Sequence, residues 1–456
     1  MRWRRSAHLL TVTAVMAAVA AVLAVAALVT GGQPAISGTA VAAAPPPATA
    51  DPPLAAVSDS APTPTAAGLA AALAPALANR DLGRLGGRVT DALTGRQLWE
   101  QGSTIPLQPA STNKLLTATA ALLTLNLDSR VTTTVLAPDQ PGVVVLVGAG
   151  DPTLSSAPPG QDTLYRGAAR ISDLADQVRR SGVSVASVQV DTSAFTGPSM
   201  APGWDPADIQ GGDIAPVEAA MVDAGRALPA TPDSVRSSTP ALDAGRALAA
   251  ALGVNPQAVS VVSTAVTGRQ IASVQSAPLI ERLLEMMNVS DNVMAECIAR
   301  EVADATNHPR SFPGAVEAVT DLLAAAKIDT TGATLVDSSG LSVIDRLTAT
   351  TLDDVVGAAA GPDQPRLRPL LDVLPVAGGS GTLSNRYVDL HTDGAAAGWL
   401  RAKTGSLTGT NALAGVVTDA GGRVLTFALL SNNAGPTGRN AIDDVAATLR
   451  SCGCGS

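Results

Sequence analysis

The chain has 456 residues, with 39 acidic and 30 basic side chains and a formal net charge of −9 at neutral pH. This charge and an aromatic content of only 2% argue against nucleic-acid binding, which needs a basic surface and stacking side chains. The three cysteines and three histidines match no zinc spacing, so we predict no metal site. Cys452 and Cys454, in a glycine-rich tail, are compatible with a disulfide or with two free thiols.

The chain begins with an apolar, uncharged run from Leu9 to Val29, which follows Arg2, Arg4 and Arg5. Such a run is long enough to span a bilayer, and the positive flank keeps the N-terminus inside. We therefore predict a membrane anchor or signal over residues 1–32, with an uncleaved anchor favoured over a cleaved signal. The rest of the chain would then lie outside the cytoplasm, in the cell envelope, either anchored to the membrane or secreted.

Residues 33–78 are rich in proline, alanine, threonine and serine and contain few large apolar side chains. This composition predicts an extended, semi-rigid linker without a fold of its own. The remainder is too long for one small core and indicates two or more domains.

Secondary-structure signals divide this remainder into three stretches. The first has two short strands and a buried helix, the second alternates strands with helices, and the third has helices followed by a strand, a hairpin and a closing helix. The first stretch is 79–129, the second 130–275 and the third 276–451. We predict an α+β catalytic domain from the first and third, with an antiparallel sheet covered by helices, and an inserted α/β accessory module from the second.

A serine and a lysine lie together at the start of the helix in the first stretch. Ser111 follows a Pro-Ala dipeptide at the helix N-terminus, where free N–H groups favour developing negative charge, and Lys114 lies on the same face. A serine hydroxyl is inert unless a base takes its proton, and a lysine with a lowered pKa can be that base. The chain has only three lysines, and arginine cannot serve as a base, so Lys114 is better explained by chemistry than as an ordinary solvated residue.

Two further short motifs carry possible catalytic groups. Ser290-Asp291-Asn292 precedes a predicted helix, where a serine could simply act as an N-cap, and Lys403-Thr404-Gly405 ends a predicted strand. Each motif is weak alone. In this order, and with two of the three lysines in them, they match the motif set of β-lactamases and penicillin-binding proteins.

With these motifs, the chain resembles the D-alanyl-D-alanine carboxypeptidase/endopeptidase family of class C low-molecular-mass penicillin-binding proteins, peptidase family S13. The long interval between the first two motifs and the phrases at 150–154, 339–342 and 374–378 are similar to that family over about residues 80–450. The resemblance implies a penicillin-binding-protein/β-lactamase-like transpeptidase fold with an inserted module. The chain departs from the family pattern at Val343, where the family often has an arginine, and the nearest arginine here is Arg346.

The resemblance also implies an acyl-enzyme mechanism on peptidoglycan stem peptides that end in D-Ala-D-Ala, without any cofactor. Ser111 would be the nucleophile and Lys114 its base, while Ser290 would pass a proton to the leaving D-alanine and Asn292 would orient the substrate amide. The implied substrate-binding residues are Lys403, Thr404, Gly405, Ser406 and Asp151. Asp151 matches a family aspartate that meets the peptide's free amine, and a turn-forming Asp-Pro is the alternative.

β-Lactam antibiotics would inhibit such an enzyme by acylating the same serine, and cross-link endopeptidase activity stays open as an addition. A catalytically silent wall-binding scaffold of the same fold is the main alternative. A dead enzyme in this arginine-biased chain should have lost its lysines, which favours the peptidase. A β-lactamase would need a deacylating group, and no motif for one is evident.

Overall fold

The structure, a computed structural model, describes residues 59–389 and 394–454. The predicted anchor and the predicted linker up to residue 58 lie outside the described residues. Among the residues that are described, no helix combines the length and the apolar character needed to cross a bilayer.

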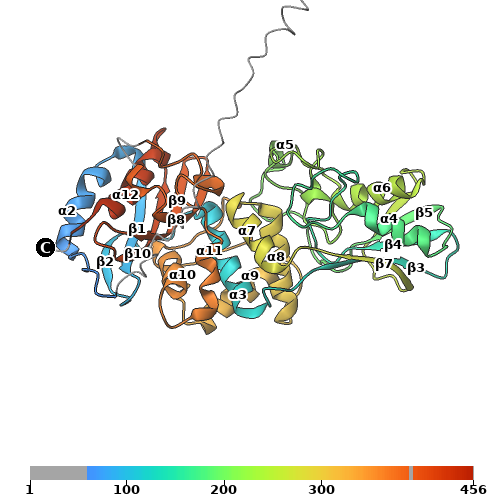
Figure 1. Cartoon of the computed structure of the whole chain (residues 1–456), viewed down its shortest axis with the longest axis horizontal. Helices are drawn as coiled ribbons and strands as arrows, with labels where there is room; N and C mark the ends of the chain where they lie inside the picture. The colour runs from blue at the N-terminus through green and yellow to red at the C-terminus, as the bar shows by residue number, and fades with distance from the viewer. Residues whose placement is uncertain (1–58, 390–393, 455–456) are drawn as a thin grey trace, which may run out of the picture. The chain divides into compact units, whose positions relative to one another are not determined.

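The first sheet has five antiparallel strands in the order β2-β1-β10-β9-β8 (Figure 1). It joins an N-terminal hairpin to three C-terminal strands, so that Gly87 of β1 lies opposite Leu429 of β10. The strands are β1 (Arg84–Asp91), β2 (Gln97–Gln101), β8 (Leu400–Leu407), β9 (Thr410–Thr418) and β10 (Val424–Asn432). The predicted α+β class with an antiparallel sheet is confirmed.

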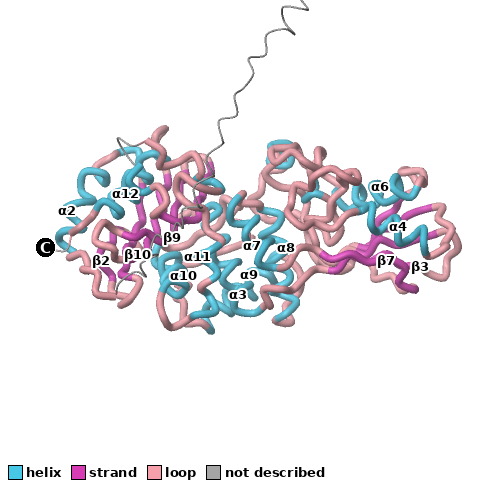
Figure 2. Tube along the Cα trace, in the orientation of Figure 1, coloured by secondary structure: helices cyan, strands magenta, loops and turns pink. Residues whose placement is uncertain are grey.

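Helices cover both faces of this sheet, because successive strand residues point to opposite sides and both sets are apolar. One face packs against α2 (Ala66–Leu77) and α12 (Gly438–Ser451), and the other against α3 (Lys114–Thr124) and α10 (Ala349–Ala360) (Figures 1 and 2). Four more helices enlarge the second layer: α7 (Leu279–Asn288), α8 (Asn292–Ala305), α9 (Phe312–Ala325) and α11 (Pro369–Asp372).

The prediction of an unfolded linker up to residue 78 is wrong for α2. Leu69 and Leu73 lie one turn apart on this helix and are fully buried against α12 and the sheet. The Thr65 hydroxyl caps the N-terminus of this helix. The Thr65 backbone N–H donates to the carbonyl oxygen of Cys454, and Cys454 forms a disulfide with Cys452. The stabilising partner thus comes from the other end of the chain, where local composition cannot reveal it.

The second sheet lies within residues 132–275 and has the order β6-β5-β4-β3-β7. Its strands are β3 (Thr132–Ala137), β4 (Val143–Val147), β5 (Ser187–Asp191), β6 (Val259–Val262) and β7 (Arg269–Gln275). The pairs β4–β5 and β5–β6 are parallel, so each needs a crossover, which α4 (Ile171–Arg180) and α6 (Pro240–Leu252) supply. These helices and strands enclose a separate apolar core.

Candidate active site

Ser111 lies in a single 3₁₀ turn, Ala110–Asn113, which leads directly into α3. Lys114 opens that helix, and its side chain is fully buried. The Lys114 Nζ atom is 2.9 Å from Ser111 Oγ, 2.6 Å from Asn292 Oδ1 and 2.8 Å from the carbonyl oxygen of Ser339. The amine therefore has a fixed position against the hydroxyl that it would deprotonate.

Burial lowers the pKa of Lys114 to about 8, although the carboxylates of Asp337, Asp291 and Glu296 oppose this shift. The physical cause is the cost of keeping an ammonium ion away from water. A minor fraction of this lysine, far larger than for an unperturbed lysine, is therefore neutral near physiological pH, and only the neutral amine can accept a proton.

The second and third motifs meet across the sheet edge. Ser290 lies between α7 and α8, and its Oγ atom is 2.9 Å from Nζ of Lys403 on β8. Lys403 is fully buried and also donates to the carbonyl oxygen of Thr404. Burial, followed by the charges of Lys114 and Arg386, holds the pKa of Lys403 well below its ordinary value.

Two glycines, Gly405 and Gly340, allow close packing of the backbone around the turn that carries Ser111. A Cβ atom on Gly405 would come within 2.7 Å of the Pro109 carbonyl oxygen, and one on Gly340 within 1.9 Å of the Ala110 carbonyl oxygen. Ala110 itself has a φ of 45°. The family resemblance places Gly405 among the substrate-binding residues; in the structure its missing side chain lets β8 approach the turn that carries Ser111.

A cavity of about 550 Å³ opens beside Ser111. Five of the predicted site residues line it: Ser111, Ser290, Asn292, Thr404 and Ser406. Lys114 and Lys403 are buried and reach the cavity through their hydrogen bonds to Ser111 and Ser290. The structure therefore brings together every predicted site residue except Asp151.

Asp151 does not line the cavity. It is buried, its Oδ1 atom accepts hydrogen bonds from the N–H and hydroxyl of Thr153, and burial raises its pKa. This is the geometry of the turn-forming alternative, and the predicted contact of Asp151 with a substrate amine has no support here. Arg346 is likewise turned to carbonyl oxygens of its own loop, including that of Val343.

Sequence reasoning missed several charged residues of the cavity wall. Asp208 and Asp213 come from the segment after the second sheet's β5, while Arg386 and Arg439 come from the loop before β8 and from α12. Partial burial, followed by repulsion from Asp213, raises the pKa of Asp208. No motif surrounds these residues, so their place in the cavity wall had no signal in the sequence.

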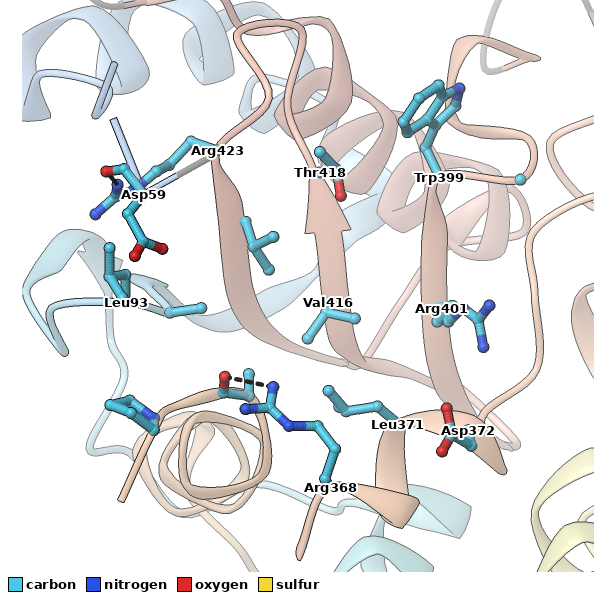
Figure 3. A pocket seen from close by; sticks show the side chains of 15 residues that line it. Asp59, Leu93, Arg368, Leu371, Asp372, Trp399, Arg401, Val416, Thr418 and Arg423 are labelled. Carbon is cyan, nitrogen blue, oxygen red and sulfur yellow. Dashed lines mark hydrogen bonds between the residues drawn. The ribbon is translucent and has the colours of Figure 1, made fainter. Parts of the chain in front are cut away.

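A second depression, of about 620 Å³, lies against β8, β9 and β10 and contains none of the motif residues (Figure 3). Trp399, Arg401 and Leu371 form part of its wall. Two of its arginines already bind protein groups, since Arg368 donates to the Ala360 carbonyl oxygen and Arg423 pairs with Asp91. We therefore place the chemistry at the cavity beside Ser111.

The fold and the three motifs define a protein of the penicillin-binding-protein class. The chain belongs to the D-Ala-D-Ala carboxypeptidase 3 (S13) family, which it matches over residues 69–233 and 226–450. Residues 1–56 match a second family, described as the Carboxypeptidase Rv3627c-like N-terminal domain. The family predicted from the sequence is thus confirmed.

Two curated relatives are similar along nearly the whole chain. Carboxypeptidase DacB of Mycolicibacterium smegmatis is 67% identical over 457 residues, covering 100% of this chain and 99% of that protein. Carboxypeptidase Rv3627c of Mycobacterium tuberculosis is 63% identical over 455 residues, with 99% of each chain covered. Among solved structures, penicillin-binding protein 4 (dacB) of Haemophilus influenzae matches with a TM-score of 0.68 at 23% identity, covering 83% of this chain and 98% of that one. This last likeness confirms the fold.

Proposed function

We propose that this protein is a serine-type D-Ala-D-Ala carboxypeptidase that acts on peptidoglycan stem peptides through an acyl-enzyme on Ser111. The observation that carries the proposal is the buried Lys114 amine, 2.9 Å from the Ser111 hydroxyl and with a pKa lowered to about 8. Family membership and the two carboxypeptidase relatives support the same activity.

In the first half-reaction, neutral Lys114 accepts the Ser111 proton as Oγ attacks the carbonyl carbon between the two D-alanines. By family resemblance, the backbone N–H groups of Ser111 and Ser406 stabilise the negative charge on the carbonyl oxygen. The tetrahedral intermediate collapses when the C–N bond breaks, and the proton passes through Ser290 to the leaving amine. Water then hydrolyses the ester and restores Ser111.

The other motif residues bind the substrate in this proposal. Asn292 orients the substrate amide, while Thr404 and Ser406 offer hydroxyl groups to its terminal carboxylate. In its protonated form, Lys403 contributes positive potential behind them, while the Arg386 guanidinium in the cavity wall is already paired with Asp443. The Thr404 Oγ1 atom is 2.8 Å from Thr382 Oγ1, which supports its orientation.

We propose further that the protein works in the cell envelope, held by an N-terminal membrane segment within residues 1–32. The substrate class supports an extracytoplasmic location. We also propose the division into a catalytic domain of residues 79–129 and 276–451, with an inserted module of 130–275, and the two separate sheets support it. Helix α2 extends the catalytic part towards the N-terminus.

Acylation by penicillin tests the assignment of Ser111. The full chain and its Ser111→Ala variant are incubated with a fluorescent penicillin, and the intact masses are measured. Ser181→Ala, at the end of α4, is the matched control. We expect one adduct on the parent and on the control and none on Ser111→Ala.

The other outcomes separate the alternatives. No adduct on a folded parent would favour the silent wall-binding scaffold. Rapid penicillin hydrolysis without accumulation would favour a β-lactamase. Release of D-alanine from a D-Ala-D-Ala stem pentapeptide then tests the carboxypeptidase reaction directly.

A further inference from the structure

Asp291, the middle residue of the second motif, is a buried carboxylate held by side chains from the inserted module. Its Oδ2 atom is 2.7 Å from the Tyr165 hydroxyl, 3.0 Å from Nη2 of Arg226 and 3.5 Å from Nη2 of Arg236. The side chains of both arginines are also almost completely buried. Asp291 and these three partners do not line the substrate cavity and play no part in the mechanism above.

The other oxygen of the same carboxylate caps the N-terminus of α8. Asp291 Oδ1 accepts a hydrogen bond from the Met294 N–H at 3.0 Å, which makes Asp291 the N-cap of the helix that carries Asn292. Burial opposes ionisation, but the charges of Arg236 and Arg226 outweigh it and hold the pKa of Asp291 well below its usual range. Asp291 is therefore an ion that links the module to the helix N-terminus.

The residue next to this ion has a strained backbone. Ser290 has a φ of 61°, in the left-handed region that side chains with a Cβ disfavour. A residue keeps this conformation only where its surroundings fix it. The fixed point on its C-terminal side is Asp291, with its partners in the module. In that conformation the Ser290 hydroxyl lies 2.9 Å from Lys403 Nζ.

Two other residues of the inserted module, Asp213 and Trp204, also contact the catalytic region. The Asp213 carbonyl oxygen accepts a 2.9 Å hydrogen bond from Asn292 Nδ2. The Trp204 indole N–H donates to Asp337 Oδ2. Asp337 Oδ1 accepts from the Ser339 N–H, and the Ser339 carbonyl oxygen accepts from Lys114 Nζ. The module is thus bonded to the groups that orient Ser290, Asn292 and Lys114.

We propose that Tyr165, Arg226 and Arg236 of the inserted module are positioning residues for acylation. They hold Asp291, and through Asp291 they keep Ser290 in its left-handed conformation and aim the first turn of α8 at the nucleophile. The inserted module is then a working part of the active site and not only an accessory domain. This inference rests on the proposed function, because its effect is measured on the acylation of Ser111.

Small changes within the cluster test the proposal in the full chain. Tyr165→Phe removes one hydroxyl and keeps the ring over which the Arg226 guanidinium lies, 5.5 Å from the ring centre. Arg226→Gln removes the charge, and Arg226→Lys restores it without the two-armed contact to Tyr165 and Asp291. Arg170→Gln is the matched control, because Arg170 belongs to the same module but donates only to carbonyl oxygens of its own loop.

The assay separates positioning from binding and from stability. Saturation kinetics with a fluorescent penicillin give the dissociation constant of the initial complex and the acylation rate constant, and the melting temperature is measured alongside. We expect Tyr165→Phe and Arg226→Gln to lower the acylation rate constant by about tenfold or more. The dissociation constant should stay within about twofold, and Arg226→Lys should recover part of the rate. Arg170→Gln should match the parent.

Three results would overturn the inference. If the parent is acylated and the cluster variants react at its rate, the cluster does not position Ser290, and the proposed function stands. If the acylation rate constant, the affinity of the initial complex and the melting temperature all fall together, and Arg226→Lys recovers none of the acylation rate, the cluster is merely structural. If a folded parent is not acylated at all, the proposed function fails first and this inference falls with it.

Discussion

The pH dependence of acylation follows directly from the environment of Lys114. Only the neutral amine can take the Ser111 proton, so the acylation rate should rise with pH as Lys114 loses its proton and level off above its pKa. An unperturbed lysine would titrate near 10.5, whereas burial brings the pKa of Lys114 to about 8. The position of this rise therefore reports the burial of Lys114.

The size of the effect can be worked out from that value. With a pKa of about 8, about one Lys114 in eleven is neutral at pH 7 and about ten in eleven at pH 9, so the rate should rise about tenfold and then flatten. With a pKa of 10.5, the rate would rise about a hundredfold over the same interval and continue to climb.

A substitution at Glu296 should move the rise in a known direction. Glu296 is fully buried, and burial, followed by the charge of Asp337, raises its pKa to about 7, so it is mostly ionised where Lys114 titrates. Its negative charge stabilises the ammonium form of Lys114. Glu296→Gln should therefore shift the rise in acylation rate to lower pH. The substitution also leaves the Arg300 charge without its carboxylate partner, which lowers the pKa of Lys114 in the same direction.

The assay is the acylation rate constant with a fluorescent penicillin between pH 6 and pH 10, corrected for spontaneous hydrolysis of the lactam. Glu317→Gln, an exposed residue of α9, is the control and should leave the profile unchanged. Thermal unfolding at each pH separates titration from loss of fold. A profile that still climbs above pH 9, or a Glu296→Gln profile displaced to higher pH, would refute the reasoning.

Two further predictions concern stability. Gly340→Ala should abolish acylation and lower the unfolding midpoint, because the new Cβ would overlap the Ala110 carbonyl oxygen. Gly160→Ala, with a similar positive φ and no atom within 4 Å, should lose only about 1–2 kcal/mol in denaturant unfolding; equal losses at both sites would contradict the overlap. Leu73→Ala should lower the free energy of unfolding by about 2–5 kcal/mol if α2 is part of the core. The control is Leu228→Ala, because Leu228 is 58% exposed and should tolerate alanine. An unchanged free energy of unfolding in Leu73→Ala would show that α2 is not required.

The three motifs could be predicted from the sequence because their chemistry restricts residue type. Arginine replaces lysine almost everywhere in this chain, so Lys114 and Lys403 stand out as residues with a task that arginine cannot perform. The structure places both of them fully buried, each within 2.9 Å of a motif serine. A local pattern was sufficient here because each motif lies on one short stretch of chain.

Asp151 shows where a local pattern is ambiguous. An Asp-Pro pair in a glycine-bounded turn suits both a ligand-binding loop and a turn that satisfies its own backbone. The choice depends on which elements cover the turn, and the chain around Asp151 buries it. The same ambiguity affected the alanine-rich residues 66–77, which are helical because α12 lies against them.

The sequence by itself determined the class of chemistry, the family and the alternation of helices and strands, since these follow from residue types and short-range periodicity. Only the tertiary structure decided that β1 pairs with β10, that Asp208, Asp213, Arg386 and Arg439 line the cavity, and that two arginines of the module hold Asp291. The physical reason is that each of these depends on a partner far away in the chain. The position of that partner is fixed by packing of the whole core, which cannot be inferred from a local stretch of sequence.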